Sequence, residues 1–554
     1  MWAFLMLILL IASWYLLTKP LFHWKNLGVT QTKSPWIILG DNWRYISPLR
    51  GQSTFFDFVK WMTEGCKATG YMGIYDFTVP VLCITDPELI KTITVKHFEY
   101  FTDILPLSID PKLESMAAGT LLLQNGEKWK SMRTLLSPIL TTKKMKFLWN
   151  FIAEETTKLV DFLSEKTSEN GCIEVEMADL FLGISRPIQL ELKHSTRKLF
   201  FRFSSDVAAN LAIGIKTDSL RGENNILYKS ALELSEIDLD GPAFLMHRFF
   251  PRLSKVLPFL ATIRNNTLFV AYLQLLGIRI FNKKSNLVFE EAYKESISAK
   301  LRSQVKRNDV VDSLLDIINS DNGDQSSLKL KSTFWDVVGM AANFFSAGLH
   351  PVSSALLFGT YELALNKDVQ ERLRLEIHQI AQKHPEVTYE VIQEMLYMDM
   401  VVSEILRKWP PVVITSRVVV KPYNLKLGTN SVKLNKKEKI LIPIFGLHHM
   451  AEYYPNPEKF DPERFSSENK NKINPYAYIP FGTGPRFCIG SRFGLMKIKL
   501  VLFHLLKNFE LIPSNKTLKP LKISAASTKF QMQEGCWIGM KRIEIAHVFT
   551  PKMI

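Results

Sequence analysis

One short loop near the end of the sequence carries the residue best suited to chemistry. It runs from Phe481 to Gly490 with the sequence FGTGPRFCIG, in which two glycines and a proline surround Cys488. Backbone N–H groups aimed at a sulfur, together with the N-terminus of a following helix, stabilise a thiolate. A thiolate is a ligand for a soft metal centre. We therefore predict that Cys488 binds a metal, although a lone cysteine in a turn is more often a buried structural residue.

The chemistry of such a site depends on the metal. A thiolate bound to haem iron donates electron density that favours cleavage of an O–O bond. Arg486 lies two residues before the cysteine and can pair with a carboxylate group of a haem. The loop is therefore a candidate haem–thiolate site.

The elements that must position this loop are predicted to be mainly helical. The longest helical signal runs from Lys331 to Leu365, with Ser332 as its cap, and an amphipathic helix covers Phe493 to Leu506. Short strands are predicted around Pro80 and between Val412 and Ile444, and the C-terminal tail is also rich in β-formers. Because helices and strands do not alternate as in a parallel α/β fold, the predicted fold class is mainly α with small β-sheets.

The first residues predict a membrane anchor. Met1 to Leu17 contains sixteen apolar residues, interrupted only by Ser13. A helix of this length, at ~1.5 Å per residue, spans roughly 26 Å and comes close to a ~30 Å hydrocarbon core. Positive charges follow the run, so the rest of the chain is expected on the cytoplasmic side. The predicted organisation is a single transmembrane helix over 1–22, a linker over 23–36 and one domain over 37–554.

Composition excludes several classes of protein. Apolar residues make up 47% of the 554 residues, which excludes a mainly disordered chain. Five cysteines without a CxxC pair exclude a disulfide scaffold and suit a reducing compartment. The net charge of +15 indicates a negatively charged partner. Because the basic runs lack interleaved aromatic residues, no nucleic-acid partner is expected. The adjacent pair His448 and His449 would point to opposite faces of a strand, which argues against a metal pair.

Four segments together resemble the cytochrome P450 family. FGTGPRFCIG is similar to the family's haem-binding loop, FxxGxRxCxG. Glu404 to Arg407 resembles its ExxR motif, 462–465 its PERF segment, and Trp129 to Arg133 its WxxxR helix. The resemblance covers nearly the whole chain. It implies a cytochrome P450 fold, so that the domain over 37–554 is a haem-thiolate monooxygenase domain.

The resemblance also implies a role for each matching residue. Cys488 is the axial ligand of haem b and a catalytic residue. A second group is implied to bind the cofactor, through propionate contacts or as part of the loop: Trp129, Arg133, Arg417, Phe481, Gly482, Gly484, Arg486 and Gly490. A third group, Glu404, Arg407 and Arg464, braces the loop.

The activity implied by the family is insertion of one oxygen atom of O₂ into a small lipophilic substrate. The similarity is greatest to microsomal, insect-type members that act on insecticides, plant toxins and other xenobiotics, or on hormones. The implied partners are NADPH–cytochrome P450 reductase, with cytochrome b5 as an additional electron donor, so NADPH acts indirectly. The implied location is the endoplasmic reticulum membrane, with the catalytic domain on its cytoplasmic face.

The sequence departs from the family at the proton relay. The family carries (A/G)Gx(D/E)T on its long central helix, where the acid and the threonine deliver protons to dioxygen. The aligned residues here are AGLHPVSS, so the acid is replaced by His350 and the threonine by Pro351. His350 can donate and accept protons near neutrality and remains a catalytic candidate. Ser353 and Ser354 are the nearest hydroxyls able to hold a water.

Three interpretations of this departure stay open. The enzyme oxygenates its substrate with an altered relay, or it rearranges substrates that already carry an O–O bond. Alternatively, it is a haem-binding protein with impaired or no oxygenase activity. A proline inside a regular helix costs on the order of 3 kcal/mol, but the family's helix is already distorted at this point.

Two segments interrupt the resemblance. Residues 182–200 and 256–274 separate stretches that otherwise continue without a break. Each is either intron-derived sequence in a gene model or a real loop. The second is apolar and falls where the family has a membrane-dipping region.

Overall fold

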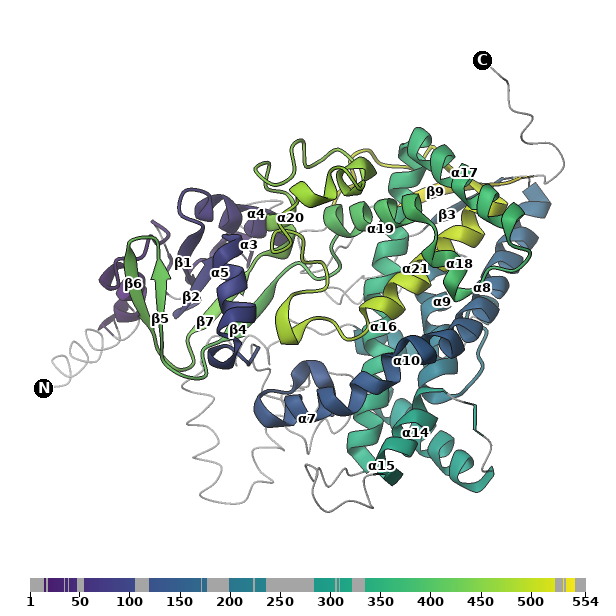
Figure 1. Ribbon diagram of the computed structural model, residues 1–554, viewed down its shortest axis with the longest axis horizontal. Helices are drawn as coiled ribbons and strands as arrows, with labels where there is room; N and C mark the ends of the chain where they lie inside the picture. Colours follow the sequence, from purple (N-terminus) through teal and green to yellow (C-terminus); the bar gives the residue numbers. More distant parts are fainter. Residues whose placement is uncertain are drawn as a thin grey trace, which may run out of the picture.

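The computed structural model joins a large helical part to a smaller part rich in strands (Figure 1). The described residues run from Trp14 to Ile543, with gaps at 16–17, 34, 38, 47–53, 105–118, 171, 177–198, 223–224, 236–282, 304–305, 308, 321–333, 524–531 and 533–534. The predicted insertion 256–274 and all but the last two residues of 182–200 lie outside the described residues. Most of the predicted anchor, residues 1–13 and 16–17, also lies outside them. Along the described stretches from Trp14 onward, none of the helices has the length and apolar character needed to cross a membrane.

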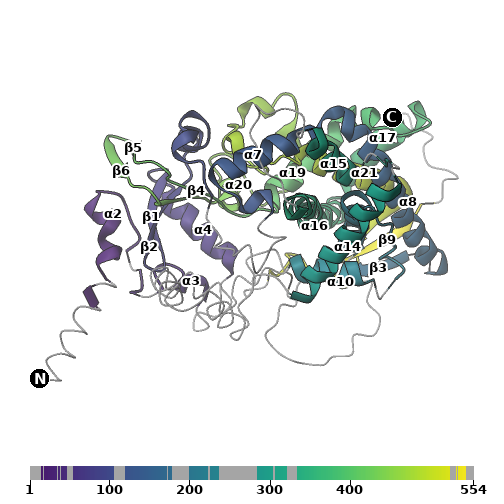
Figure 2. The ribbon, with the colours of Figure 1, turned by 90° about the horizontal axis from the view of Figure 1, so that it is seen from below.

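The long helix α16 (Phe334–Leu365) is the centre of the helical part. Viewed from below, it is seen nearly end-on among the surrounding helices (Figure 2). It packs against α9 (Leu199–Ala208) and α21 (Ser491–Asn508). The predicted helix over 331–365 is therefore confirmed from Phe334 onward, and the predicted cap at residue 332 lies outside the described residues. Pro351 lies inside α16, and the helix continues through it.

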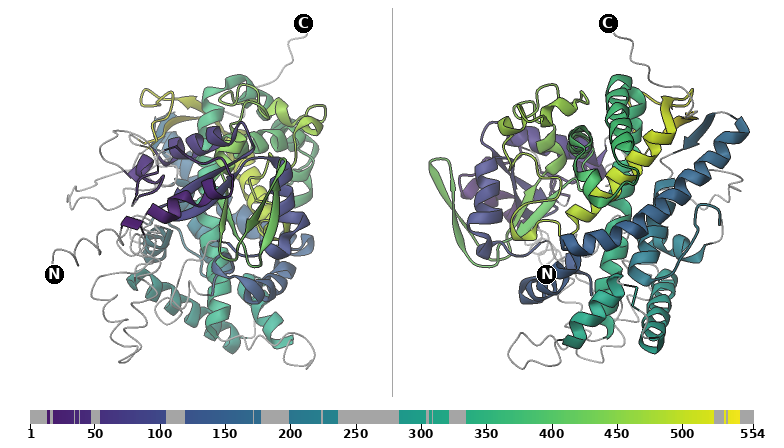
Figure 3. Two further views of the ribbon diagram at one scale, coloured as in Figure 1. Left: turned by 90° about the vertical axis from the view of Figure 1, so that its left-hand side faces the viewer. Right: turned by 45° about the vertical axis from the view of Figure 1, so that its right-hand side comes forward.

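Helix α8 (Thr142–Asn170) runs beside α21, as the right-hand view shows (Figure 3). Within the described ranges, the other α-helices are α2 (His23–Asn26), α3 (Trp43–Ile46), α4 (Phe55–Cys66), α5 (Pro87–Lys91), α7 (Gly126–Leu136), α10 (Ile226–Ser235), α14 (Lys283–Ser303), α15 (Val310–Ser320), α17 (Lys367–Lys383), α18 (Tyr389–Gln393), α19 (Leu396–Lys408) and α20 (Ile444–His448). This content confirms the predicted mainly helical class.

A four-stranded sheet of order β1-β2-β7-β4 forms the core of the smaller part. Its strands are β1 (Tyr71–Asp76), β2 (Val79–Ile84), β7 (Lys439–Ile442) and β4 (Thr415–Val418). Both β1 with β2 and β4 with β7 pair antiparallel, whereas β2 and β7 pair parallel. The two strands predicted around Pro80 are present, but Pro80 lies within β2, opposite Tyr75, and not between the strands. The proline is tolerated because the ladder to β7 begins only at Val81.

Two further sheets are small. Strand β9 (Trp537–Arg542) lies between β3 (Cys172–Glu176) and β8 (Phe509–Pro513), and both pairings are antiparallel. The hairpin of β5 (Tyr423–Leu427) and β6 (Asn430–Leu434) lies at the end of the smaller part that is farthest from the helices (Figure 1). The predicted small sheets are thus present, formed by strands from both ends of the chain.

Candidate functional site

The loop before α21 holds Cys488 through its own backbone. The Cys488 N–H donates to the carbonyl of Phe481 over 2.9 Å, and the Phe487 N–H donates to the carbonyl of Gly484 over 2.9 Å. Among the five cysteines, Cys488 is the exposed one, whereas Cys66, Cys83 and Cys536 are buried and Cys172 is partly exposed. The loop therefore presents the thiol instead of packing it into a core.

The three glycines of the loop differ in what they do. Gly482 and Gly484 have φ angles of 73° and 71°, in the left-handed region that favours glycine. A Cβ on Gly484 would approach the carbonyl oxygen of Thr94 to 1.8 Å, whereas a Cβ on Gly482 or Gly490 would meet nothing within 4 Å. Gly484 therefore packs the loop against the short helix Thr92–Lys96, while Gly482 and Gly490 border open space that a cofactor can use.

The pKa of the Cys488 thiol reflects opposing influences. Although the side chain is exposed, desolvation by the surrounding protein atoms raises this pKa, while the Gly490 N–H and the charge of Arg133 lower it, and the net direction is upward. The loop therefore stabilises the thiolate as predicted, but this effect is smaller than the opposing effect of desolvation on the pKa. A cation bound to the sulfur would complete the stabilisation, because a coordinated thiol is deprotonated.

Arg486 leads a cluster of three arginines beside the cysteine loop. Its guanidinium lies 3.9 Å from the centre of the Trp129 ring. Three of its N–H groups donate to the carbonyls of Thr102 and Gln124 and to the side-chain oxygen of Asn125, over 2.9 to 3.1 Å. These contacts fix the plane of the guanidinium and leave two of its five N–H groups for another partner.

The other two arginines come from separate elements. Arg133, on α7, donates to the carbonyl of Phe487 over 2.7 Å. Arg417, on β4, is 2% exposed and donates to the carbonyls of Ser416 and Thr483 over 2.7 and 3.4 Å. The Nε atom of Arg417 is buried and has no hydrogen-bond partner among the described residues. A buried donor of this kind is costly unless something else accepts from it.

The arginine cluster has little negative charge to balance it among the described residues. Burial lowers the pKa of Arg417 to about 10. Burial also lowers the pKa of Arg486 to about 9, with contributions from the charges of Arg417 and Arg133, while the charge of Asp103 opposes this shift. No carboxylate of the described residues lies within ion-pair distance of any of the three guanidiniums. The cluster therefore fits a cofactor that carries negatively charged groups.

A buried ion pair braces the segment that leads into the loop. Arg407 donates twice to the carboxylate of Glu404, over 2.7 and 2.8 Å, and both side chains are fully buried. Arg464 lies 3.6 Å from the same carboxylate. Burial raises the pKa of Glu404, and the hydrogen bonds from Arg407 oppose this. The predicted cluster of Glu404, Arg407 and Arg464 is thus present.

His448 extends this bracing toward the cysteine loop. It ends helix α20, so the expectation that His448 and His449 lie on a strand is wrong. The Ile479 N–H donates to His448 Nε2 over 3.0 Å, which leaves Nδ1–H to donate to the carbonyl of Arg407 at 3.2 Å. The imidazole is therefore neutral and connects α19 to the residue two positions before Phe481.

The middle of α16 satisfies its polar groups differently. The Ser353 hydroxyl donates to the carbonyl of Leu349 over 2.7 Å and also lies 3.1 Å from the carbonyl of Phe200 and from the Ser204 hydroxyl. Ser353 therefore attaches α16 to α9, and the expectation that it holds a water for proton transfer is not supported. His350 is half-buried on the same helix.

Sequence reasoning missed one buried side chain near this point. Lys497, on α21, is 1% exposed and donates to the carbonyl of Gly348 over 3.3 Å. One signal was available in the sequence, a lysine flanked by apolar residues in an amphipathic helix. A lysine at such a position is buried, and a buried lysine requires a partner. Its partner is 149 residues away, which spacing along the chain cannot reveal.

Comparison with known proteins places these features in a family. The profile named Cytochrome P450 matches residues 52–533. The chain is 36% identical over 490 residues to Cytochrome P450 9e2 of Blattella germanica, covering 86% of each chain. It is 33% identical over 454 residues to Cytochrome P450 3A12 of Canis lupus familiaris, covering 82% of this chain and 81% of that relative.

Proposed function

Because the chain belongs to the cytochrome P450 family, whose members bind haem b, we propose that it is a haem-thiolate monooxygenase acting on a small lipophilic substrate. One oxygen atom of O₂ enters the substrate, and two electrons and two protons convert the other to water. The observation that carries this proposal is the cluster of Arg133, Arg417 and Arg486 beside the exposed Cys488. No carboxylate of the described residues forms an ion pair with these arginines, so the cluster suits the two propionates of haem b.

Each loop and cluster residue has a proposed role toward the haem. Cys488 would bind the haem iron through its thiolate, and Trp129 and the three arginines would hold the propionates. The unpartnered Nε of Arg417 is the donor most in need of such an acceptor. Gly482 and Gly490 leave room for the cofactor, and Phe481 packs near Phe487, with ring centres 6.2 Å apart. When bound, the haem supplies the redox-active iron at which dioxygen is activated.

The partners and location are proposed from the family and from charge. We propose that NADPH–cytochrome P450 reductase supplies the electrons, with cytochrome b5 as an additional donor. A net charge of +15 favours an acidic partner and an anionic membrane face. The proposed setting is the endoplasmic reticulum membrane, with residues 1–22 as the anchor. Xenobiotics such as insecticides and plant toxins, and hormones, are the proposed substrate classes.

A second candidate function is favoured by the His350–Pro351 pair. Pro351 supplies no hydroxyl, and the Ser353 hydroxyl is engaged with Leu349 and α9. His350 is then the residue proposed to transfer protons in place of the family's acid. If it does not, the protein binds haem with impaired or no oxygenase activity, or it rearranges substrates that already contain an O–O bond and need no proton delivery to dioxygen.

A carbon monoxide difference spectrum of the reduced full-length protein tests the haem–thiolate site. The native protein should show the red-shifted band of a thiolate-ligated haem. Cys488→Ser should lose this band, whereas the matched control Cys172→Ser should retain it, because Cys172 lies in β3. Folded native protein without the band would overturn the proposal.

Turnover experiments then separate the candidate functions. The native protein with NADPH and the reductase should consume NADPH in proportion to the hydroxylated product. NADPH consumption that yields only peroxide and water indicates impaired oxygenation. Rearrangement of a hydroperoxide without NADPH indicates the isomerase.

A further inference from the structure

Lys497 is a buried lysine in an environment that offers it few partners. It lies on α21 and is 1% exposed. Its Nζ atom donates to the carbonyl of Gly348 over 3.3 Å and lies 5.3 Å from the centre of the Phe203 ring. It also lines a small cavity bordered by Phe344, Gly348 and Phe493. A buried ammonium normally has a carboxylate partner, so its contact with a backbone carbonyl needs an explanation.

A second lysine on the same helix shows the usual arrangement. Lys499 is 2% exposed and forms an ion pair with Asp399 of α19. Positions 497 and 499 lie on different faces of a helix. One lysine of α21 therefore contacts a carboxylate, and the other contacts the backbone of α16.

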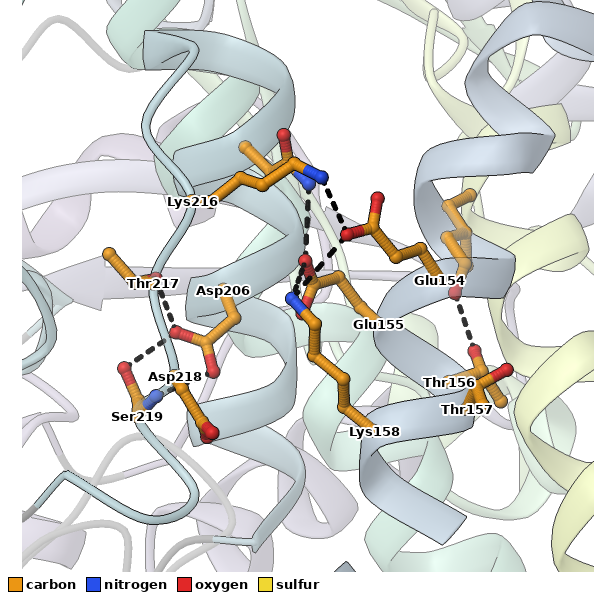
Figure 4. Close-up of polar contacts among 12 residues, drawn as sticks. Glu154, Glu155, Thr156, Thr157, Lys158, Asp206, Lys216, Thr217, Asp218 and Ser219 are labelled. Carbon is orange, nitrogen blue, oxygen red and sulfur yellow. Dashed lines mark hydrogen bonds and ion pairs between the residues drawn. The ribbon is translucent and has the colours of Figure 1, made fainter. Parts of the chain in front are cut away.

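The carboxylate whose charge acts on Lys497 already accepts hydrogen bonds from other groups. Asp206, on α9, accepts hydrogen bonds from the hydroxyls of Thr217 and Ser219 and from the Ser219 N–H, over 2.5 to 2.8 Å (Figure 4). No carboxylate of the described residues lies within ion-pair distance of Lys497. Asp206 thus acts on Lys497 only through its charge.

The contact lies next to the point where α16 lacks a backbone N–H donor. In a regular helix the carbonyl of Ala347 accepts from the N–H of residue 351, which Pro351 lacks, and the proline ring crowds the same carbonyl. Gly348 is the next residue, and it has no side chain to stiffen the backbone. We propose that Lys497 is a positioning residue that braces α16 where Pro351 removes a backbone hydrogen bond, and that it attaches α16 to the helix that begins after the Cys488 loop.

Energetic considerations support a local role. Burial lowers the pKa of Lys497 to about 7, so the protein pays global stability to keep an amine at this point. A residue that serves only the core would be replaced by an apolar side chain at no loss. The inference rests on the proposed function only in supposing that the geometry around His350 and Pro351 is used in catalysis.

Hydrogen–deuterium exchange of the full-length holoprotein tests the brace without any turnover. Lys497→Met keeps the length of the side chain and removes the donor. Exchange of amides in 347–353 should become at least severalfold faster, while the midpoint of global thermal unfolding stays equal or rises. Lys499→Met is the matched control, since it breaks the ion pair with Asp399 and should leave exchange in 347–353 unchanged. Lys497→Arg retains a charged donor and should restore slow exchange.

A double-mutant cycle tests whether the contact made by Lys497 compensates for the backbone N–H that Pro351 lacks. Pro351→Ala returns the N–H to α16 without adding a hydroxyl. In that background Lys497→Met should have little effect on exchange in 347–353. An equal effect of Lys497→Met in both backgrounds would overturn the proposal, as would unchanged exchange in the single variant.

A spectroscopic readout separates this inference from the proposed function. The native protein and Lys497→Met should both give the thiolate–haem carbon monoxide band, whereas Lys497→Met should change the proportions of high-spin and low-spin haem in the substrate-free spectrum. Unchanged proportions would contradict a positioning role toward the haem. Absence of the carbon monoxide band in the native protein would contradict the proposed function and leave the exchange result intact.

Discussion

The Cys488 loop and the middle of α16 satisfy their polar groups in different ways. Around the loop, the Arg407 guanidinium donates to the Glu404 carboxylate and to the carbonyl of His448, and the His448 imidazole donates to the carbonyl of Arg407. The charge left unbalanced there belongs to arginines. In α16, Pro351 removes a helix donor, and the nearby carbonyl of Gly348 is contacted by a lysine from another helix.

This difference indicates which part of the protein tolerates change. The loop is the proposed haem site, and its backbone and the neighbouring side chains are joined by hydrogen bonds. The centre of α16 departs from the family pattern and uses individual contacts from α9 and α21. We therefore expect substitutions near the loop to have the larger effects.

The largest effect is expected from Arg407→Met. The change leaves the carboxylate of Glu404 buried with Arg464 at 3.6 Å as its remaining charged partner. Breaking one side of a buried ion pair costs about 3–5 kcal/mol. Denaturant unfolding of the holoprotein measures this loss. Arg464→Met should cost less because that arginine is more exposed, and equal losses would show that the two arginines are not distinguished by burial.

The next effect is expected from Arg417→Met and has opposite signs in two states. Removing a charged donor to a propionate costs about 1.5–3 kcal/mol, or about 10–100-fold in haem affinity. Without haem, the same change removes a buried charge that repels Arg486, so the apoprotein should become more stable. Haem transfer to an acceptor protein and apoprotein unfolding measure the two quantities. A loss of stability in both the haem-bound protein and the apoprotein would contradict the proposed repulsion between Arg417 and Arg486.

An intermediate effect is expected on acidification. Burial lowers the pKa of His448 to about 3, against 6.5 for an unperturbed histidine. Between these values the unfolded chain binds a proton that the folded protein does not, so stability falls as pH falls, by up to about 1.4 kcal/mol per pH unit. Unfolding measured at several pH values should show this slope. His448→Asn should reduce the slope by about one proton, and an unchanged slope would contradict the assigned neutral imidazole.

The smallest effect is expected from restoring the relay in α16. The double variant His350→Asp with Pro351→Thr should raise the ratio of product to NADPH consumed by about fivefold, or roughly 1 kcal/mol. The gain is modest because His350 already transfers protons in the proposed mechanism. The single variant Pro351→Thr separates the hydroxyl from the acid. A native protein that is already fully coupled would show that the departure from the family has no catalytic cost.

Local patterns in the sequence predicted local structure well. An aspartate followed by proline is typical of a helix start, and the Asp86 carboxylate accepts from the Leu89 N–H at the beginning of α5. The spacing of Glu404 and Arg407 places both on one helix face, because residues three apart are neighbours, and the two side chains form an ion pair with each other. Both results depend on atoms a few residues apart.

Contacts between distant segments could not be predicted in the same way. Gly484 belongs to the cofactor motif, yet a Cβ there would collide with the carbonyl of Thr94. Ser353 suggested a water site but attaches to α9, and Lys497 showed no sign of its contact with α16. Each depends on which element packs opposite, and this is decided by the tertiary fold instead of by local spacing.

The parallel pairing of β2 with β7 has a consequence for biosynthesis. β2 ends at Ile84, but its partner begins at Lys439. At about 5–20 residues per second, the ribosome needs roughly 20–70 s to make the intervening ~350 residues. During that time the β1–β2 hairpin has one edge without its native partner, and such edges pair readily with other chains. The nascent protein is therefore expected to need chaperone cover for most of its synthesis, before the residues that surround Cys488 exist.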